Sequence, residues 1–288
     1  MRNDSALHIT VRTGEARAIL CETTQTAETA RQIHRASRTC AAALGRGLSA
    51  AVLLSSTQKT GRLTLTFKGG GPAGALVMIA AEGVLKATID DPAVELPLKA
   101  NGQPDVGGAI GREGRVTVVR DLGLKEPYVG QSSLVTGEIA EDLCLYCTVS
   151  EQQPSLCALG ARVGERVLSS GGLLIQPLPG CSEQTITDLE ARALAFSNIS
   201  GLLERESPEE LVNSLFNGMD PVVLSSRPLA YQCDCSRERM ERALISMGRD
   251  ELQLLIEEQG GAELVCHFCR SAYAFDAGQL RVLMKEQD

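Results

Sequence analysis

Tryptophan is absent from this 288-residue sequence, and aromatic residues make up only 3% of it. Base-stacking platforms are therefore scarce, and a net charge of −8 argues against a surface that holds nucleic acid through phosphate contacts. No stretch approaches the ~18 consecutive apolar residues that a membrane span requires. These shortages predict a protein that binds neither nucleic acid nor a membrane.

Histidine is also scarce, with His8, His34 and His267 as its only occurrences. No His/Ser/Asp set and no G-x-S-x-G motif is visible. Residues 69–74 (GGGPAG) lack the Gly-Lys-Ser/Thr ending of a phosphate loop, which favours a turn between strands. The sequence therefore predicts a protein that is not an enzyme.

Ten cysteines are present. Whether they form disulfides depends on the redox state of the cellular compartment in which the protein resides. Residues 1–10 (MRNDSALHIT) are too polar for the apolar region of a signal peptide, so we expect a cytoplasmic protein. Cytoplasmic thiols are kept reduced, which makes metal binding or redox chemistry more informative than a disulfide framework.

The charge divides the chain into three segments. Residues 1–179 are close to neutral, whereas residues 180–231 and 232–288 carry nearly all of the excess acid. We expect an α+β fold with a large mixed helix and sheet domain over 1–179, a helical linker over 180–231, and a small C-terminal domain over 232–288.

The large domain is predicted to combine strands with two helical regions. An opening hairpin turns at residues 13–15, and an Ala-rich helical region over 24–59 contains Gly45 and Gly47, which indicate a kink or a close helix contact. A second helix over 137–148 has Glu138, Glu141 and Asp142 in its first turns, where a helix dipole favours acids. The alternating or apolar stretches predicted as strands are 62–68, 75–81, 115–120, 160–168 and 173–178.

The linker contains two predicted acidic helices. Ser207 is a good N-cap, Pro208 suits the first helical position, and Gly218 can end this second helix. The apolar residues of the first helix recur at three- and four-residue steps: Ile186, Leu189, Ala193, Phe196, Ile199 and Leu203. These apolar faces need a surface to cover, and the large domain is the nearest candidate.

Two close cysteine pairs, Cys233 with Cys235 and Cys266 with Cys269, lie about 30 residues apart in the last segment. Four thiolates with this spacing can bind one Zn²⁺ tetrahedrally, and they need no help from His267. An apolar core in a piece this small supplies roughly 3–5 kcal/mol, whereas structural zinc contributes on the order of 10–16 kcal/mol. Zinc should therefore dominate the folding of residues 232–288.

The same spacing permits a second bonding state. Slight bending brings residues two or three apart within disulfide range, so each pair can close a small, strained and reversible ring. A thioredoxin-like role for Cys266 and Cys269 is weaker, because a strand over 270–275 is expected to follow the pair, where that chemistry expects a helix.

The other six cysteines are predicted to be structural or incidental. Cys144 and Cys147 share one face of the helix over 137–148, which favours packing over metal or redox work. The remaining four are isolated in the sequence, and of these Cys181 is the one most worth probing for exposure: Cys21, Cys40, Cys157 and Cys181.

Taken together, these motifs resemble the 33-kilodalton redox-regulated heat-shock chaperone family of bacteria over essentially the whole chain. The tail carries that family's C-x-C and C-x-x-C pairs, at Cys233, Cys235, Cys266 and Cys269. The order and number of further strings make the match specific: CSRER at 235–239, CHFC at 266–269, ALGR at 43–46, GGGPAG at 69–74, DLG at 121–123, YVGQ at 128–131, SEQ at 150–152, GG at 171–172 and QPLPG at 176–180.

The resemblance implies an ATP-independent holdase that is inactive while reduced and bound to one zinc ion. Oxidant, with mild unfolding, would form the disulfides Cys233–Cys235 and Cys266–Cys269, expel zinc and melt the linker. The exposed apolar surface would then capture unfolding client proteins, and the active form would be a homodimer. The six extra cysteines depart from the family pattern and leave open off-pathway disulfides or a different oxidant threshold.

Two other functions remain open at this point. One is a thiol-disulfide oxidoreductase that uses Cys266 and Cys269. The other is a constitutive interaction module stapled by zinc, whose binding would be indifferent to oxidant.

Overall fold

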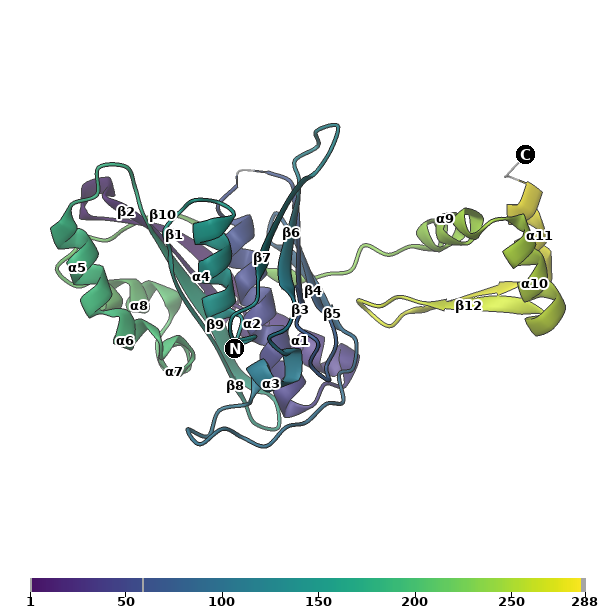
Figure 1. Cartoon of the computed structure of the whole chain (residues 1–288), viewed down its shortest axis with the longest axis horizontal. Helices are drawn as coiled ribbons and strands as arrows, with labels where there is room; N and C mark the ends of the chain where they lie inside the picture. Colours follow the sequence, from purple (N-terminus) through teal and green to yellow (C-terminus); the bar gives the residue numbers. More distant parts are fainter. Residues whose placement is uncertain (1, 59, 286–288) are drawn as a thin grey trace. The chain divides into compact units, whose positions relative to one another are not determined.

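A computed structural model describes residues 2–58 and 60–285. The chain forms two compact units, Met1–Gln232 and Cys233–Asp288, and each combines helices with antiparallel strands (Figure 1). The expected α+β fold class is confirmed. In the described part of the chain, no helix is both long and apolar enough to cross a membrane.

A five-stranded antiparallel sheet forms one layer of the large unit. The predicted opening hairpin is confirmed, with the short helix η1 (Arg12–Gly14) at its turn. The predicted strands over 160–168 and 173–178 have the wrong bounds, because the chain turns at residues 164–166 and forms a longer hairpin. The strands, in spatial order, are β10 (Val222–Pro228), β1 (Ser5–Val11), β2 (Ala16–Glu22), β9 (Val167–Pro177) and β8 (Leu156–Val163).

A six-stranded sheet forms another layer. The three strands predicted over 62–68, 75–81 and 115–120 are confirmed within a residue, and residues 69–74 connect two of them as a turn. The last strand, β11, runs parallel to β5, while the other pairs are antiparallel. The order is β11 (Ala230–Tyr231), β5 (Val84–Ile89), β4 (Leu76–Ala81), β3 (Arg62–Lys68), β6 (Arg115–Asp121) and β7 (Tyr128–Ser133).

Between the sheets lies α2 (Arg38–Ser55), in which every residue from Thr39 to Leu54 is buried (Figure 1). The region predicted over 24–59 is two helices, because Arg35 adopts a left-handed conformation (φ 50°) after α1 (Thr24–His34). The close contact predicted at the glycines is confirmed without a kink. A Cβ on Gly45 would lie 2.8 Å from Ser170 Oγ, and one on Gly47 would lie 2.8 Å from Met78 Sδ.

Two further helices lie beside the six-stranded sheet and its connections, α3 (Val106–Ile110) and α4 (Ala140–Val149). The helix predicted over 137–148 therefore starts later than expected. Glu141 and Asp142 lie in its first turn, but Glu138 precedes the helix and pairs instead with Arg46 and Lys99. Two buried or half-buried cations attract this carboxylate more strongly than a helix end does.

Four short helices occupy the segment over 180–231. The single amphipathic helix predicted over 186–203 is wrong, because the chain breaks at Arg192 and Asn198 and so follows the twisted sheet beneath it. The second predicted helix is confirmed, with Ser207 and Glu210 forming a capping box. The helices are α5 (Glu183–Ala191), α6 (Ala193–Phe196), α7 (Ile199–Leu203) and α8 (Pro208–Leu215).

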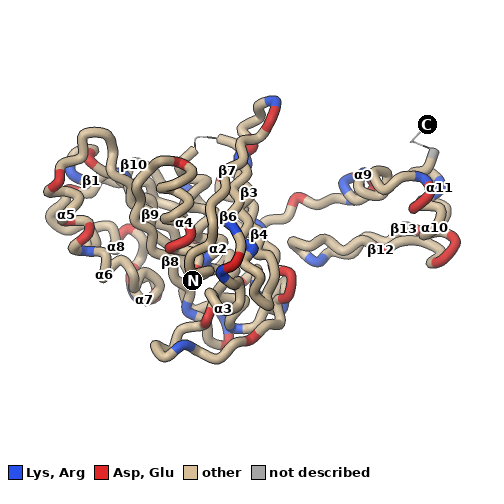
Figure 2. The backbone as a smooth tube through the Cα atoms, viewed as in Figure 1, with Lys and Arg blue, Asp and Glu red and all other residues tan. Residues whose placement is uncertain are grey.

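These helices cover the face of the five-stranded sheet that α2 does not (Figure 1). Acidic residues are frequent along them (Figure 2). Their apolar side chains and those of the sheet form a second hydrophobic core, which we call the linker core. Its sheet residues include Leu7, Ile9, Leu20, Leu173 and Ile175, and its helix residues include Leu189, Phe196, Ile199, Leu203, Leu211, Val212, Leu215 and Phe216.

The C-terminal unit packs three helices against a two-stranded hairpin. The strand predicted over 270–275 is confirmed with a small shift, as β13, whereas the three helices were not predicted. Among its described residues, 233–285, seven buried hydrophobic side chains form the core: Leu244, Leu252, Ile256, Phe275, Leu280, Leu283 and Met284. The elements are α9 (Arg237–Met247), α10 (Arg249–Gln259), β12 (Gly261–Val265), β13 (Ala272–Asp276) and α11 (Ala277–Lys285).

Candidate metal centre

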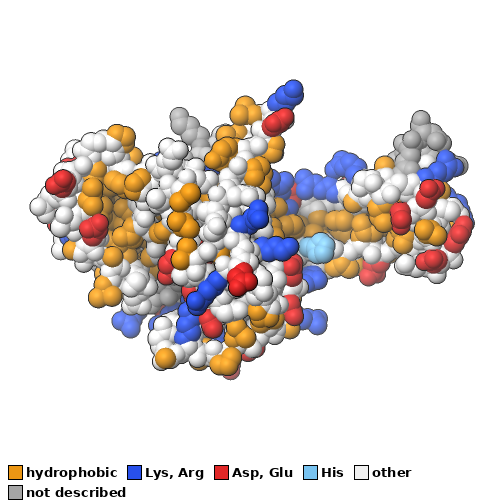
Figure 3. Space-filling view, viewed as in Figure 1, with side chains coloured by type: hydrophobic (Ala, Val, Ile, Leu, Met, Phe, Trp, Pro, Cys, Tyr) orange, Lys and Arg blue, Asp and Glu red, His pale blue; other side chains and the backbone are white. Residues whose placement is uncertain are grey.

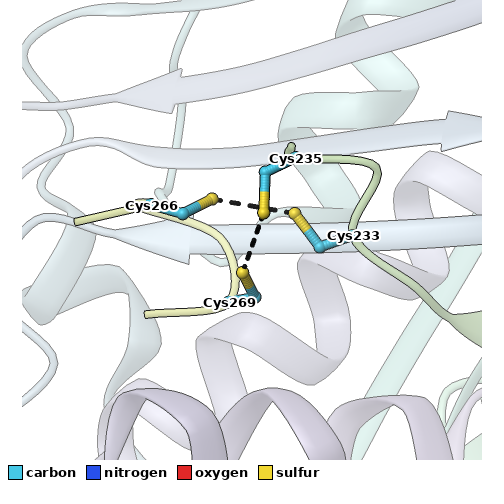
Figure 4. Close-up of side chains that lie close together, drawn as sticks. All are labelled: Cys233, Cys235, Cys266 and Cys269. Carbon is cyan, nitrogen blue, oxygen red and sulfur yellow. Dashed lines mark hydrogen bonds between the residues drawn. The ribbon is translucent and has the colours of Figure 1, made fainter. Parts of the chain in front are cut away.

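Four cysteine sulfurs converge at one end of the C-terminal unit (Figure 4). The Sγ atoms of Cys233, Cys235, Cys266 and Cys269 all lie within 4.8 Å of one another. Two of the separations join one sequence pair to the other: 3.7 Å from Cys233 Sγ to Cys266 Sγ and 3.3 Å from Cys235 Sγ to Cys269 Sγ. The structure thus brings together all four cysteines that the spacing singled out.

Local backbone structure explains the convergence. Cys233 and Cys235 lie in the extended segment just before Ser236, whose hydroxyl caps the first turn of α9. Cys266 and Cys269 lie in the turn of the β12–β13 hairpin, where the Cys266 N–H donates to the Ser271 carbonyl and the Arg270 N–H donates to the Cys266 carbonyl. A tight turn of this kind aims both of its thiols to one side.

The arrangement fits a tetrahedral metal ion. Four sulfurs at the Zn–S distance of about 2.3 Å would be separated from one another by about 3.8 Å, which lies within the range of separations observed. Soft thiolates are the donors that structural zinc sites use, and a complete set of four leaves no open position for a substrate. The donor set can therefore hold a metal ion of the structural type.

Neighbouring groups make the four thiols unequal. Burial raises the pKa of Cys233 to about 12. Burial also opposes ionisation of Cys269, but hydrogen bonds from Ser271 and from the other cysteines outweigh it and lower the pKa of Cys269 to about 7. Tyr273 Oη lies 3.1 Å from Cys235 Sγ. A thiolate at Cys269 is therefore the easiest to form before a metal binds.

Sequence reasoning missed the residues that surround the cluster. Ser271 and Tyr273 contact the sulfurs, and Arg237 stacks 4.2 Å above the ring of Phe275 while donating to the Ala274 carbonyl at 3.1 Å. The Cys-Ser-Arg-Glu-Arg string at 235–239 was the only available signal, because the partners on β13 lie more than thirty positions away. His267 is exposed, and the cluster consists of cysteines alone.

The six other cysteines lie in the large unit. Cys21, Cys40 and Cys147 are buried, and Cys181 is half-buried. Cys157, which is isolated in the sequence, lies beside Cys144 in the fold, and both residues line one cavity. The hairpin that carries Cys157 on β8 brings it beside α4, although the two residues are separated in the sequence by a turn.

A large α+β unit joined to a small module with four clustered thiols defines a class of proteins with a candidate structural metal site. Comparison with known proteins is more specific. The family model described as "Hsp33 protein" matches residues 4–276, and the chain belongs to that family. It is therefore a chaperone, and membership implies that it binds unfolded client proteins.

Individual relatives agree over nearly their full length. A protein named "33 kDa chaperonin" from Ruminiclostridium cellulolyticum is 40% identical, and one of the same name from Clostridium tetani is 42% identical; each alignment covers 98% of both chains. The crystal structure of the 33 kDa chaperonin (heat shock protein 33 homolog) of Thermotoga maritima matches with a TM-score of 0.91 and 34% identity, over 99% of both chains.

Proposed function

We propose that the chain is a redox-regulated, ATP-independent holdase of the cytoplasm. Reduced protein would bind one zinc ion through Cys233, Cys235, Cys266 and Cys269 and be inactive. The single observation that carries the proposal is the four-thiol cluster in a unit whose described residues form a core of seven buried hydrophobic side chains.

Zinc, when bound, would supply most of the folding free energy of this unit. A seven-residue core is at the lower end of what stabilises a domain of this size, while a structural zinc site contributes on the order of 10–16 kcal/mol. Any reaction that consumes the thiolates therefore also removes the main source of stability.

A hydroperoxide is a suitable oxidant for the two pairs. In each pair one thiolate attacks the peroxide oxygen and becomes a sulfenic acid, with release of water or hydroxide; the second thiol then displaces the sulfenic oxygen as water and closes the disulfide. The products are the disulfides Cys233–Cys235 and Cys266–Cys269. No thiolate is left to donate, so the oxidised tail has lost its ligand set.

The linker over 180–231 would be the element that responds. Its four helices are too short to be stable in isolation, and they are held by burial in the linker core, where Phe196 and Phe216 pack with ring centroids 5.8 Å apart. If this segment unfolds, both the helix side chains and the sheet face beneath them become exposed. A patch of that kind binds the apolar segments of unfolding proteins.

The division into a chaperone domain (1–179), a metastable linker (180–231) and a redox switch (232–288) is part of this proposal. In the structure the linker packs within the large unit. We also propose that the active form is a homodimer, since a newly exposed apolar surface on each copy favours association.

Light scattering from a heat-unfolding model client tests the proposal. Reduced, zinc-loaded protein and peroxide-treated protein are compared at equal concentration, with Cys181→Ser, which leaves the tail intact, as a matched control. We expect only the oxidised wild-type and control proteins to suppress scattering. Analytical ultracentrifugation of the same samples tests the dimer.

Other outcomes would favour the alternatives. Equal suppression by both forms would indicate a constitutive zinc-stapled module. Turnover of a model disulfide that disappears in Cys269→Ser would indicate an oxidoreductase. Reduced protein without zinc on metal analysis would overturn the switch altogether.

A further inference from the structure

A second pair of neighbouring thiols lies in the large unit, away from the tail cysteines in sequence. Cys144 is on α4 and Cys157 is on β8, and each is partly accessible to solvent. Both line a cavity of about 370 Å³. The cavity is also lined by Ile175 of β9 and by Ile186 and Leu189 of the linker helix α5.

The two thiols are chemically unequal. The neighbouring side chain and backbone of Cys157 lower the pKa of Cys144, although burial and Glu141 oppose this. The neighbouring Cys144 side chain, together with burial, raises the pKa of Cys157 well above its ordinary value. One sulfur is thus prepared to be a thiolate, and its neighbour keeps its proton.

The third cysteine of this region does not share these properties. Cys147, less than one helical turn from Cys144, is fully buried, and burial raises its pKa to about 12. It does not line the cavity. The arrangement therefore distinguishes Cys144 from Cys147, although sequence spacing places both on one face of α4.

We propose that Cys144 and Cys157 form a second oxidisable pair in the lining of this cavity, which a small hydroperoxide converts to a disulfide. The Cys144 thiolate attacks the peroxide oxygen, giving a sulfenic acid and, after proton uptake, water. The Cys157 sulfur then attacks the Cys144 sulfur, and the sulfenic oxygen leaves as a second water with the Cys157 proton. One peroxide is reduced and two thiols are oxidised.

The surroundings suit this reaction. The cavity is large enough for several molecules the size of water or peroxide, and its walls are mainly apolar, so little competes with the thiolate for the oxidant. The disulfide would tie α4 to β8 beneath α5. This modification does not depend on the tail cysteines, and it goes beyond the proposed function.

Peptide mapping of the full-length, zinc-loaded protein tests the pair. The protein is treated with hydrogen peroxide, free thiols are blocked with N-ethylmaleimide, and the chain is cut after glutamate. Cleavage at Glu141, Glu151 and Glu165 puts Cys144 and Cys147 on the peptide 142–151 and Cys157 on the peptide 152–165. We expect these two peptides to be joined under non-reducing conditions and separated by reductant.

Two variants assign the link. Cys147→Ala should retain it, whereas Cys144→Ser should lose it and leave Cys157 free to react with the maleimide. Thiol counting adds an independent readout, because wild-type protein should lose six of its ten thiols rather than four.

Three results would overturn the proposal. The first is maleimide on Cys157 in the peptide 152–165 after the tail pairs have oxidised. The second is loss of the link in Cys147→Ala, and the third is a disulfide that joins Cys157 to a tail peptide. The wild-type and Cys147→Ala maps decide the question even if Cys144→Ser folds poorly. Failure here would leave the zinc switch untouched, since the scattering assay measures that separately.

Discussion

The central helix of the large unit and the helices of the C-terminal unit differ in composition and in burial, because α2 is rich in Ala and Leu whereas α9 and α10 are rich in charged residues. In α2 every residue from Thr39 to Leu54 is buried, whereas α9 buries only Leu244 and α10 only Leu252 and Ile256. Burial of apolar surface contributes roughly 25 cal/mol per Å², so the first region is stable by packing alone. The second region has a much smaller core, and under the proposed function its stability would depend on the metal and on the redox state of the four thiols.

The linker lies between these extremes. Its helices bury large side chains in the linker core, but each is short, so its structure depends on that contact rather than on helix propensity. Leu194, 85% exposed, shows that apolar residues are not all used for packing, and apolar side chains are scattered among polar ones on the visible surface (Figure 3). A region held by one interface is the part of the large unit that is easiest to release.

Removing the four candidate metal ligands should have the largest effect on stability, and it should affect the C-terminal unit but not the large unit. With Cys233, Cys235, Cys266 and Cys269 all changed to Ser, we expect the C-terminal unit to lose on the order of 10–16 kcal/mol of metal-derived stability and unfold. Region-resolved hydrogen exchange should show full exchange in β12, β13 and α10 with protection retained in α2. Persistent protection of β12 and β13 would contradict the proposed role of zinc.

Weakening the linker core comes next. Phe196→Ala should cost about 3–5 kcal/mol, because it removes a fully buried ring that packs against Phe216. We expect the reduced variant to suppress client scattering without oxidant. Leu194→Ala, two residues away on the same helix but exposed, is the matched control and should behave like wild type. If the Phe196→Ala variant still suppresses scattering only after oxidation, the linker core does not cover the client site.

A milder substitution, at the N-cap of α8, also tests the role of the linker. Ser207 accepts a hydrogen bond from the Glu210 N–H, and Glu210 accepts one from the Ser207 N–H at 2.8 Å. Ser207→Ala should destabilise α8 by about 1 kcal/mol and lower the peroxide concentration needed for activation. Ser214→Ala, at an exposed site on the same helix, provides the comparison. An unchanged oxidant threshold would argue that α8 is not part of the released segment.

The smallest expected effect concerns a carboxylate of the large unit. Arg31 and the Val167 N–H hold the pKa of Glu28 at about 2, below its ordinary 4.5. A depressed pKa adds stability above about pH 4.5, and this stability is lost as pH falls toward 2. Glu28→Gln should therefore cost about 1–2 kcal/mol at pH 7 and almost nothing near pH 2.

Thermal unfolding of the large-unit transition across this pH range provides the measurement, with Glu113→Gln, at an exposed acid of the same unit, as control. A cost for Glu28→Gln that stays constant down to pH 2 would mean that the ion pair is not its source. An equal change in the unfolding temperature of the C-terminal unit would mean that the effect of Glu28→Gln is not confined to the large unit.

Local patterns in the sequence predicted much of the fold. The alternation in residues 62–68 and 115–120 indicated strands, and the Ser207 cap marked a helix start, because each signal depends only on neighbouring residues. The single helix over 186–203 was wrong, and the helical region over 24–59 is divided into two helices, for the opposite reason. The left-handed turn at Arg35 and the breaks at Arg192 and Asn198 follow from packing against sheets formed by distant segments.

The sequence by itself determined the four-cysteine set, the turn at 69–74 and the resemblance to a chaperone family, because ligand type and short spacing are local properties. Tertiary structure alone decided that the four sulfurs converge, which sheet face the linker covers and that Cys157 lines the same cavity as Cys144. Each of these depends on contacts between residues far apart in the chain, and only the folded arrangement of strands and helices determines such distances.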